Sequence, residues 1–218
     1  MSTHEKILRE GSPVKRAAIL SSAQVLFLRD GFERTSMDAV AAHAEVSKRT
    51  VYDYYGDKAR LLHDVVKGAA ESLLTTVREA IDENLSYDAP ITTVQQLEDA
   101  LGSFVGEIAT TIVASADYAT VVTLVGAQRS QLPALEEFLW STAPEDAIAE
   151  RLAHFHDVGQ LDAPDARLAA DHFNALTTLL AYSGQGDPMS ADRDRARRSM
   201  VDGVRVFIRA YGVPAPGR

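Results

Sequence analysis

Basic and hydroxyl side chains concentrate in one short stretch of the chain. It contains five such residues within seven positions: Lys48, Arg49, Thr50, Tyr52 and Tyr54. Guanidinium and ammonium groups donate hydrogen bonds to guanine edges and phosphates, hydroxyls donate to phosphates, and the threonine methyl group suits thymine. This combination favours contact with nucleic acid. The alternative is a solvated helix face that happens to be basic.

Two short predicted helices position this stretch. Ser36 can cap a first helix with apolar residues at helical spacing, and Ser47 can cap a second that runs to about Tyr55. A tight connection at Glu45–Val46 joins them, which is the geometry of a helix-turn-helix. A helix of under about three turns is not stable on propensity alone, and exposed tyrosines without an apolar stripe are unusual on an idle surface. The pattern therefore favours a binding role.

Helical periodicity also dominates the rest of the sequence. One helix can begin near Pro13 and end before Gly31, and Asp57 can cap a much longer one. Four or five further helices follow, and strand signals are nearly absent. The sequence therefore predicts an all-α fold of about nine helices, with a three-helix N-terminal module followed by a helical body.

The distribution of charge separates the two ends of the chain. The net charge of the 218 residues is −9, yet residues 1–60 carry a balance of +2 and the remainder carries −11. A mildly basic head on an acidic body indicates a DNA-facing end, because binding follows the local field. The absence of cysteine excludes disulfides and thiolate chemistry and suits a cytoplasmic location. The sequence contains no run of about 18 apolar residues, so it does not predict a membrane span.

Catalytic and metal-binding signatures are missing from the sequence. There is no GxxxxGK[ST] phosphate loop, no GxGxxG after a predicted strand and no GxSxG motif. His154 and His156 are two positions apart, so on a helix they point away from each other and cannot chelate one ion. We therefore expect no cofactor, no metal and no enzymatic activity. A helical enzyme with a buried acidic cluster around Glu107 and Asp117 is the distant alternative.

A linked series of short motifs covers most of residues 13–62. It consists of residues 19–23, Leu26-Phe27, Gly31-Phe32, Thr35-Ser36-Met37, residues 44–55 and Asp57-Lys58. Together these motifs resemble the N-terminal domain of the TetR family of transcriptional regulators, and the resemblance continues in helix number and length to the C-terminus. Glu45 departs from the usual Gly and Tyr55 from the usual Phe. Glutamate in a tight turn costs backbone strain if its φ is positive.

The resemblance implies a repressor that binds a palindromic operator as a homodimer and is released by a small-molecule effector. A ligand-independent activator or architectural DNA-binding protein is the alternative. The implied organisation is a disordered arm at 1–12, a helix-turn-helix domain at 13–58, a ligand-binding and dimerisation domain at 59–212, and a disordered tail at 213–218. The long helix that begins at Asp57 is the expected lever between the two domains, since a ligand acts only by favouring one of two states.

The resemblance also assigns residues to each task. It makes Lys48, Arg49 and Thr50 groove-facing. It makes Thr35, Ser47, Tyr52, Tyr54 and Lys58 phosphate contacts, and Ser36 completes the DNA-binding set. The candidate pocket residues are Phe104, Glu107, Ile108, Tyr118, Val121, Leu124, Gln128 and Trp140. The candidate dimer interface lies on the last two helices, which are apolar on more than one side, at Leu168, His172, Phe173, Leu176, Leu179, Met200, Val204, Phe207 and Ile208. The alternative for these residues is intramolecular core.

Overall fold

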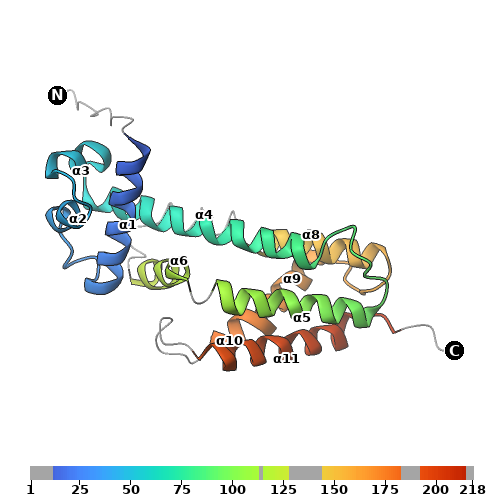
Figure 1. The fold of residues 1–218 in the computed structure, drawn as a ribbon. Helices are drawn as coiled ribbons and strands as arrows, with labels where there is room; N and C mark the ends of the chain where they lie inside the picture. Colours follow the sequence, from blue (N-terminus) through green and yellow to red (C-terminus); the bar gives the residue numbers. More distant parts are fainter. Residues whose placement is uncertain (1–11, 113–114, 128–143, 183–191, 215–218) are drawn as a thin grey trace, which may run out of the picture. The chain divides into compact units, whose positions relative to one another are not determined.

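The computed structural model describes residues 12–112, 115–127, 144–182 and 192–214. Within these ranges every regular element is helical, and the one β-bridge joins Leu161 to Gly212. The elements are α1 Pro13–Asp30, α2 Met37–His43, α3 Lys48–Tyr55, α4 Lys58–Asn84, α5 Val94–Thr111, α6 Ala116–Thr120, the π-turn η1 Val121–Val125, α8 Pro144–Asp157, α9 Ala166–Asn174, the π-turn η3 Ala175–Leu179, α10 Leu180–Tyr182 and α11 Arg193–Tyr211 (Figure 1). The predicted all-α fold is confirmed.

Helix boundaries in the N-terminal part follow the capping residues of the sequence. Helix α1 begins at Pro13 and ends at Asp30, and it is followed by Gly31, whose φ of 84° suits glycine. Ser36 and Ser47 each accept a hydrogen bond from the backbone N–H three residues later. The Asp57 carboxylate accepts a hydrogen bond from the Arg60 backbone N–H at 2.8 Å and so caps the start of α4. These predicted caps are confirmed.

The chain forms two compact units, and the long helix α4 contributes to both. The first unit comprises Met1–Glu71 with Thr120–Phe138, and the second comprises Ser72–Ala119 with Leu139–Arg218. Relative to the division expected at residue 58, the first unit also includes the first part of α4 and the turn η1. The arm expected at 1–12 and the tail expected at 213–218 lie mostly outside the described residues.

A small apolar core holds the first unit together. Residues from α1, α2, α3 and the start of α4 fill it, and the fully buried ones include Ile19, Val40, Val51, Leu61 and Leu62. The segment η1 also packs against α1, and the buried Thr120 hydroxyl just before it accepts a hydrogen bond from Gln24 of α1 at 3.1 Å. Burial of this apolar surface is what fixes helices that are too short to be stable alone.

Helices α5 and α11 run side by side in the second unit (Figure 1). An aromatic row extends through its core: Phe173 stacks on Phe104 and meets Phe207 edge-to-face, and Phe207 stacks on Tyr211. No single helix of the described ranges is long and apolar enough to span a bilayer, and only the bent pair of α5 with α6–η1 reaches that length and composition together. In the same residues no group of three or more His, Asp or Glu side chains could hold a metal ion.

Candidate nucleic-acid interface

Helix α3 is fixed by its inner face and by its first turn. Val51 and Tyr55 are buried in the core of the first unit, and the Ser47 hydroxyl oxygen accepts the Thr50 N–H at 3.1 Å. The Tyr55 hydroxyl donates to the Arg16 carbonyl oxygen at 3.4 Å, and burial raises the pKa of Tyr55 to about 12. With one face anchored in this way, the opposite face of α3 must point to solvent.

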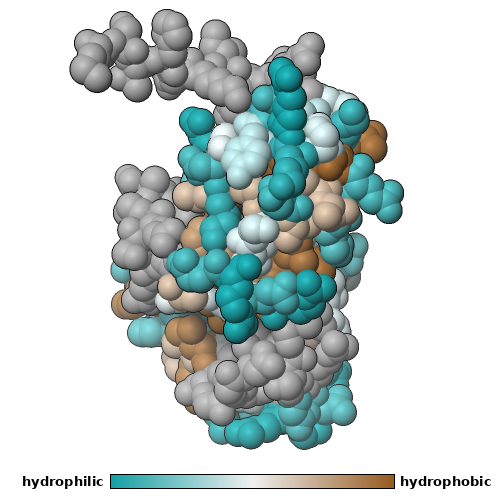
Figure 2. Space-filling model, turned by 90° about the vertical axis from the view of Figure 1, so that its left-hand side faces the viewer, coloured by the Kyte–Doolittle hydropathy of each residue, from teal (hydrophilic) through white to brown (hydrophobic). Residues whose placement is uncertain are grey.

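That outer face carries the predicted groove-facing cations. The side chain of Arg49 is 90% exposed and that of Lys48 is 67% exposed. Tyr52 is exposed as well, while Tyr54 is half-buried beside Tyr55. Hydrophilic side chains cover much of the surface at this end of the chain (Figure 2). The structure thus presents the long basic side chains of Lys48 and Arg49 and the phenol of Tyr52 on one short, anchored helix. Base-edge and phosphate contacts need this arrangement.

Each of the two cations is paired with a carboxylate of the same chain. Lys48 forms an ion pair with Asp38 of α2, and the Arg49 Nε lies 3.5 Å from the Asp53 carboxylate one turn later. Such exposed pairs contribute at most about 1 kcal/mol, so a phosphate or a guanine edge can replace the carboxylate. Thr50 is less available than expected, because it is half-buried and its hydroxyl shares a 2.8 Å hydrogen bond with that of Ser47.

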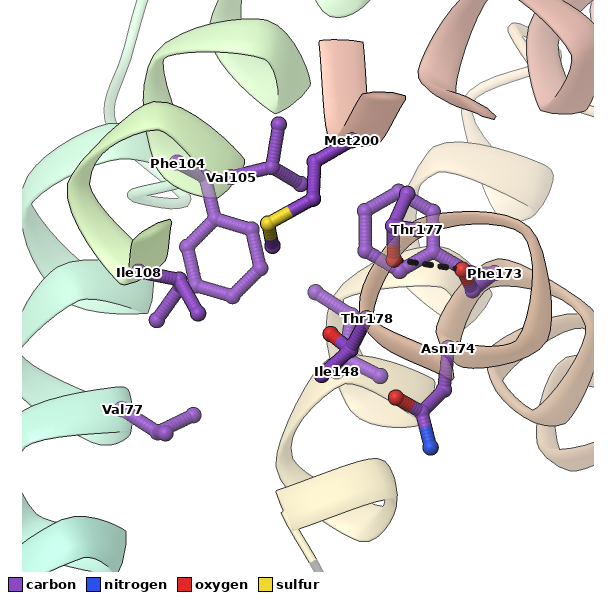
Figure 3. A pocket seen from close by; sticks show the side chains of 10 residues that line it. All are labelled: Val77, Phe104, Val105, Ile108, Ile148, Phe173, Asn174, Thr177, Thr178 and Met200. Atoms are coloured by element: carbon purple, nitrogen blue, oxygen red, sulfur yellow. Dashed lines mark hydrogen bonds between the residues drawn. The ribbon is translucent and has the colours of Figure 1, made fainter. Parts of the chain in front are cut away.

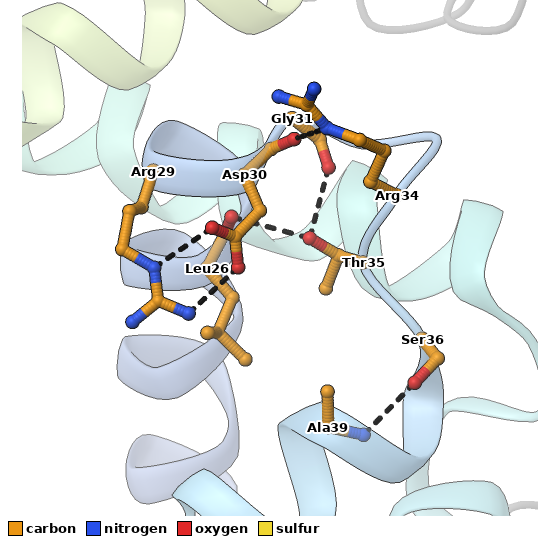
Figure 4. Close-up of polar contacts among 8 residues, drawn as sticks. All are labelled: Leu26, Arg29, Asp30, Gly31, Arg34, Thr35, Ser36 and Ala39. Carbon is orange, nitrogen blue, oxygen red and sulfur yellow. Dashed lines mark hydrogen bonds and ion pairs between the residues drawn. The ribbon is translucent and has the colours of Figure 1, made fainter.

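Two residues of the predicted DNA-binding set serve as helix caps. Ser36 and Ser47 are exposed, and their hydroxyl oxygens accept the N–H groups of Ala39 and Thr50 at 3.1 Å each (Figure 4 shows the first). A hydroxyl that accepts one hydrogen bond still has a proton to donate. The caps therefore remain compatible with phosphate contact at the same two positions.

Thr35 requires a correction. Its side chain is buried, and its hydroxyl bonds the carbonyl oxygens of Leu26 at 3.2 Å and Gly31 at 2.9 Å (Figure 4). These bonds tie Thr35 to the last turns of α1 and to the glycine that follows the helix. Thr35 therefore closes the α1–α2 connection and is not placed to contact a phosphate.

Lys58, which was assigned as a phosphate contact, also has partners within the chain. Its Nζ donates to the carbonyl oxygens of Phe32 at 2.8 Å and Glu33 at 3.2 Å, and lies 4.3 Å from the centre of the Phe32 ring. The ammonium group thus ties the start of α4 to the α1–α2 connection. Arg34 holds the same connection from another side, where its Nε donates to the Asp30 carbonyl oxygen at 2.6 Å (Figure 4).

The turn between α2 and α3 contains the strain predicted at Glu45. Its φ is +54°, the one positive value among the described residues other than glycine. Val46 N–H donates to the Ala41 carbonyl at 3.0 Å and Glu45 N–H to the Ala42 carbonyl at 3.3 Å, so Glu45 occupies the left-handed position of a Schellman motif. That position explains why glycine would suit it better.

The residues proposed for a ligand pocket are distributed over both units. Phe104 and Ile108 line a cavity of about 70 Å³ in the second unit (Figure 3). Glu107 does not line it and instead accepts a hydrogen bond from Asn84 at 2.7 Å, and Tyr118 is half-buried against the core. Val121 and Leu124 belong to the first unit. Gln128 and Trp140 lie outside the described residues.

Sequence reasoning missed most of the cavity wall. The missed residues come from α4, α5, α8, α9, η3 and α11 and are Val77, Val105, Ile148, Phe173, Asn174, Thr177, Thr178 and Met200. The available signal was the presence of Asn174, Thr177 and Thr178, three polar residues at helical spacing within the otherwise apolar residues 173–181.

Five residues of the expected dimer interface instead form the core of the second unit. They are Phe173, Met200, Val204, Phe207 and Ile208, all at most 8% exposed. This corrects their assignment, because side chains consumed by the chain's own core cannot present a surface to a second copy. Leu168 and Leu179 are 48% and 61% exposed, His172 is exposed and Leu176 is half-buried. Leu180 and Val206, which the sequence analysis did not single out, are also exposed.

An anchored helix-turn-helix with solvent-facing cations, followed by an all-helical body, is the architecture of a transcriptional regulator. A family model described as "Bacterial regulatory proteins, tetR family" matches residues 19–65, and one described as "AefR-like transcriptional repressor, C-terminal domain" matches residues 100–213. The second match covers more than half of the chain. The chain therefore belongs to the TetR family, whose members are regulators and not enzymes.

Curated relatives match the helix-turn-helix region. The DNA-binding transcriptional repressor TetR of Mycobacteroides abscessus is 46% identical over 48 residues, which is 22% of this chain and 25% of that protein. The regulator YdeS of Bacillus subtilis is 43% identical over 47 residues, or 22% of this chain and 24% of that protein. The matched stretch thus spans about a quarter of the length of these relatives.

Solved structures match almost the whole chain. A TetR-family regulator from Mesorhizobium loti superposes with a TM-score of 0.80 at 20% identity and covers 93% of this chain and 100% of its own. The flavonoid-responsive regulator FrrA gives a TM-score of 0.63 at 25% identity, with 94% of this chain and all of its own covered. At 20% identity, the first of these likenesses establishes the shared fold.

Proposed function

We propose that this chain is a repressor that binds a palindromic operator as a homodimer and leaves it when a small molecule occupies the second unit. The observation that carries the proposal is helix α3, which is anchored by Val51 and Tyr55 and directs Lys48 and Arg49 outward. An arginine in this position suits a guanine edge, and each good bidentate pair discriminates by about 1–3 kcal/mol. Such a repressor works in the cytoplasm, where the DNA lies.

Dimerisation follows from the small footprint of one α3 helix. A helix of 8 residues reads only a few base pairs, whereas two such helices related by a two-fold axis read both halves of a palindrome. The exposed leucines Leu168, Leu179 and Leu180 supply apolar surface for this contact. They replace the buried residues of α11 in the proposed interface.

Release by a ligand is supported by the cavity and by the continuity of α4. This helix runs without interruption from Lys58, which bonds the α1–α2 connection, to beyond Val77, which lines the cavity. A ligand that favours one position of Val77 can therefore act on the helix that supports the helix-turn-helix. FrrA is named as flavonoid-responsive, and the Mycobacteroides abscessus relative is named as a repressor.

Fluorescence anisotropy tests this proposal. The purified protein is titrated into the intergenic DNA beside its own gene and into shuffled DNA of equal length, over a series of salt concentrations. Tight binding to the native sequence alone, saturating at one or more dimers per site, is the expected result. Equally weak binding to both DNAs that vanishes with salt would contradict operator recognition. Specific binding that no small molecule weakens would point to a ligand-independent activator or architectural protein.

A further inference from the structure

The cavity of the second unit has one polar wall, and its other walls are apolar (Figure 3). The apolar walls include Val77 of α4, Ile108 of α5 and Met200 of α11. The polar groups come from Asn174 at the end of α9 and from the threonines of η3. None of the described residues that line the cavity is charged.

The groups on the polar wall differ in what they offer to a ligand. The Thr177 hydroxyl donates to the Phe173 carbonyl oxygen at 2.6 Å within its own helix. The Thr178 hydroxyl instead points across the cavity toward Ile108, and the Asn174 carboxamide lies one turn earlier on the same wall (Figure 3). A hydroxyl and a carboxamide can each donate and accept, and in apolar surroundings such hydrogen bonds are strong.

Helix α11 packs closely against η3, the segment that carries the threonines of the polar wall. A Cβ atom at Gly203 would lie 2.1 Å from the Leu176 carbonyl oxygen, so the α11 backbone approaches η3 as closely as glycine allows. Short π-helical segments such as η3 are frequent at functional sites. A wall fixed before binding needs little ordering when a ligand arrives, which favours affinity.

We infer that this cavity binds a small uncharged molecule with an apolar body and one hydrogen-bonding group, which Asn174 and Thr178 recognise. The inference rests on the proposed function, because it names the chemical class of the effector. An ionised ligand is disfavoured, since the described wall offers no opposite charge to offset its desolvation. The cavity of about 70 Å³ is roughly half of the ~150 Å³ that holds benzene. A ring-sized ligand therefore displaces the unbranched Met200 side chain.

Phenol and toluene test the polar wall because they share one shape and differ in a single hydroxyl. Binding to the protein without DNA is measured by isothermal titration calorimetry, with benzoate as the charged probe. We expect phenol to bind about three- to tenfold more tightly than toluene, the range that one neutral hydrogen bond supplies, and benzoate not to bind. In Thr178→Val, phenol should fall toward the affinity of toluene, while toluene is unchanged.

Two further variants make the test specific. Val77→Phe fills the cavity from the apolar side and should abolish binding of both phenol and toluene, which keeps the inference testable if Thr178→Val does not fold. Thr110→Val is the matched control, because that hydroxyl bonds the Gly106 carbonyl at 3.1 Å on α5 and does not line the cavity. Phenol should bind this control as it binds the wild type.

Three results would overturn the inference: no binding of phenol, benzoate binding as tightly as phenol, or equal losses for phenol and toluene in Thr178→Val. The calorimetry is independent of DNA, so its failure is distinct from failure of the proposed function. Operator binding without phenol binding would refute the ligand class alone. Phenol binding without operator binding would refute the proposed function and leave the chemistry of the cavity intact.

Discussion

Replacement of Lys58 by methionine separates two roles that a basic residue beside DNA can have. The Lys58 ammonium donates hydrogen bonds of 2.8 Å and 3.2 Å to the carbonyls of Phe32 and Glu33 and lies 4.3 Å from the Phe32 ring centre. Methionine keeps the unbranched stem and removes all of these polar contacts. At this half-buried position their combined loss should cost about 2 kcal/mol of unfolding free energy, which corresponds to a Tm roughly 4–8 °C lower.

The DNA-binding consequence of Lys58→Met follows from the same geometry. A phosphate contact would contribute about one unit to the slope of log affinity against log salt. Because two carbonyls already hold this ammonium, we expect the slope to stay unchanged while affinity falls with the displaced α1–α2 connection. Anisotropy across a salt series measures the slope, and thermal unfolding measures the stability.

Lys67→Met is the matched control for this substitution. Lys67 lies on the same helix, is 45% exposed and sits 3.9 Å from Glu71, so its loss should change stability by less than about 0.5 kcal/mol. A slope that drops by about one in Lys58→Met, with stability intact, would refute the positioning role and restore the phosphate contact.

Five other substitutions probe separate parts of the account. Arg49→Ala should cost roughly 1–3 kcal/mol on the operator and relax base preference, measured by anisotropy on a panel of single-base variants; an equal loss on all DNAs would contradict base reading. Glu45→Gly relieves the φ of +54° and should stabilise the protein by about 1 kcal/mol in urea unfolding, so a loss would exclude strain there. Gly203→Ala should destabilise the protein by roughly 2–4 kcal/mol, because its Cβ would lie 2.1 Å from a backbone oxygen. Gly68→Ala, whose Cβ would meet nothing within 4 Å, should stabilise the protein by about 0.5–1 kcal/mol. Equal changes in unfolding free energy for the two variants would refute the close approach at Gly203. Burial raises the pKa of Tyr55 from 10.0 to about 12, so the folded state holds the phenol proton more tightly than the unfolded state does. The resulting stability is complete below pH 10 and is lost as the pH rises to 12. Tyr55→Phe should remove this alkaline loss, and identical alkaline unfolding curves for the variant and the wild type would contradict the prediction.

The helix-turn-helix was predictable because its signals are local. Ser36 and Ser47 mark the helix starts, and the spacing of Val51 and Tyr55 indicates the buried side of α3. Once that side is known, the outward direction of Lys48 follows from helical geometry. Periodicity and capping together were sufficient for the site that faces DNA.

Roles that depend on backbone partners were not predictable. Thr35 and Lys58 both bind carbonyl oxygens of the α1–α2 connection, and a carbonyl has no signature in the sequence. A threonine or lysine in that context has the right type for a phosphate contact, and only the fold shows that the Thr35 hydroxyl and two of the three Lys58 N–H donors bond carbonyl oxygens. The family resemblance predicted the role of each residue from its type and position, but it did not show which groups surround that residue in the fold.

The dimer interface was overpredicted for a different reason. An apolar stripe on a helix shows that one face is buried but does not show which surface covers it. Phe207 and Met200 of α11 are completely buried by the same chain, whereas Leu179 remains exposed. The polar wall of the cavity was missed because it comes from Asn174 and Thr178, in a stretch whose apolar pattern indicated only packing.

Hydroxyl-radical footprinting of the protein on the DNA beside its own gene tests the central claim most directly. A homodimer that places its two α3 helices in the major groove should protect two patches related by a two-fold axis, with centres about 34–36 Å apart or a multiple of that distance. Arg49→Ala should weaken both patches together. A single patch, or protection that is the same on shuffled DNA, would contradict a dimeric operator-binding regulator.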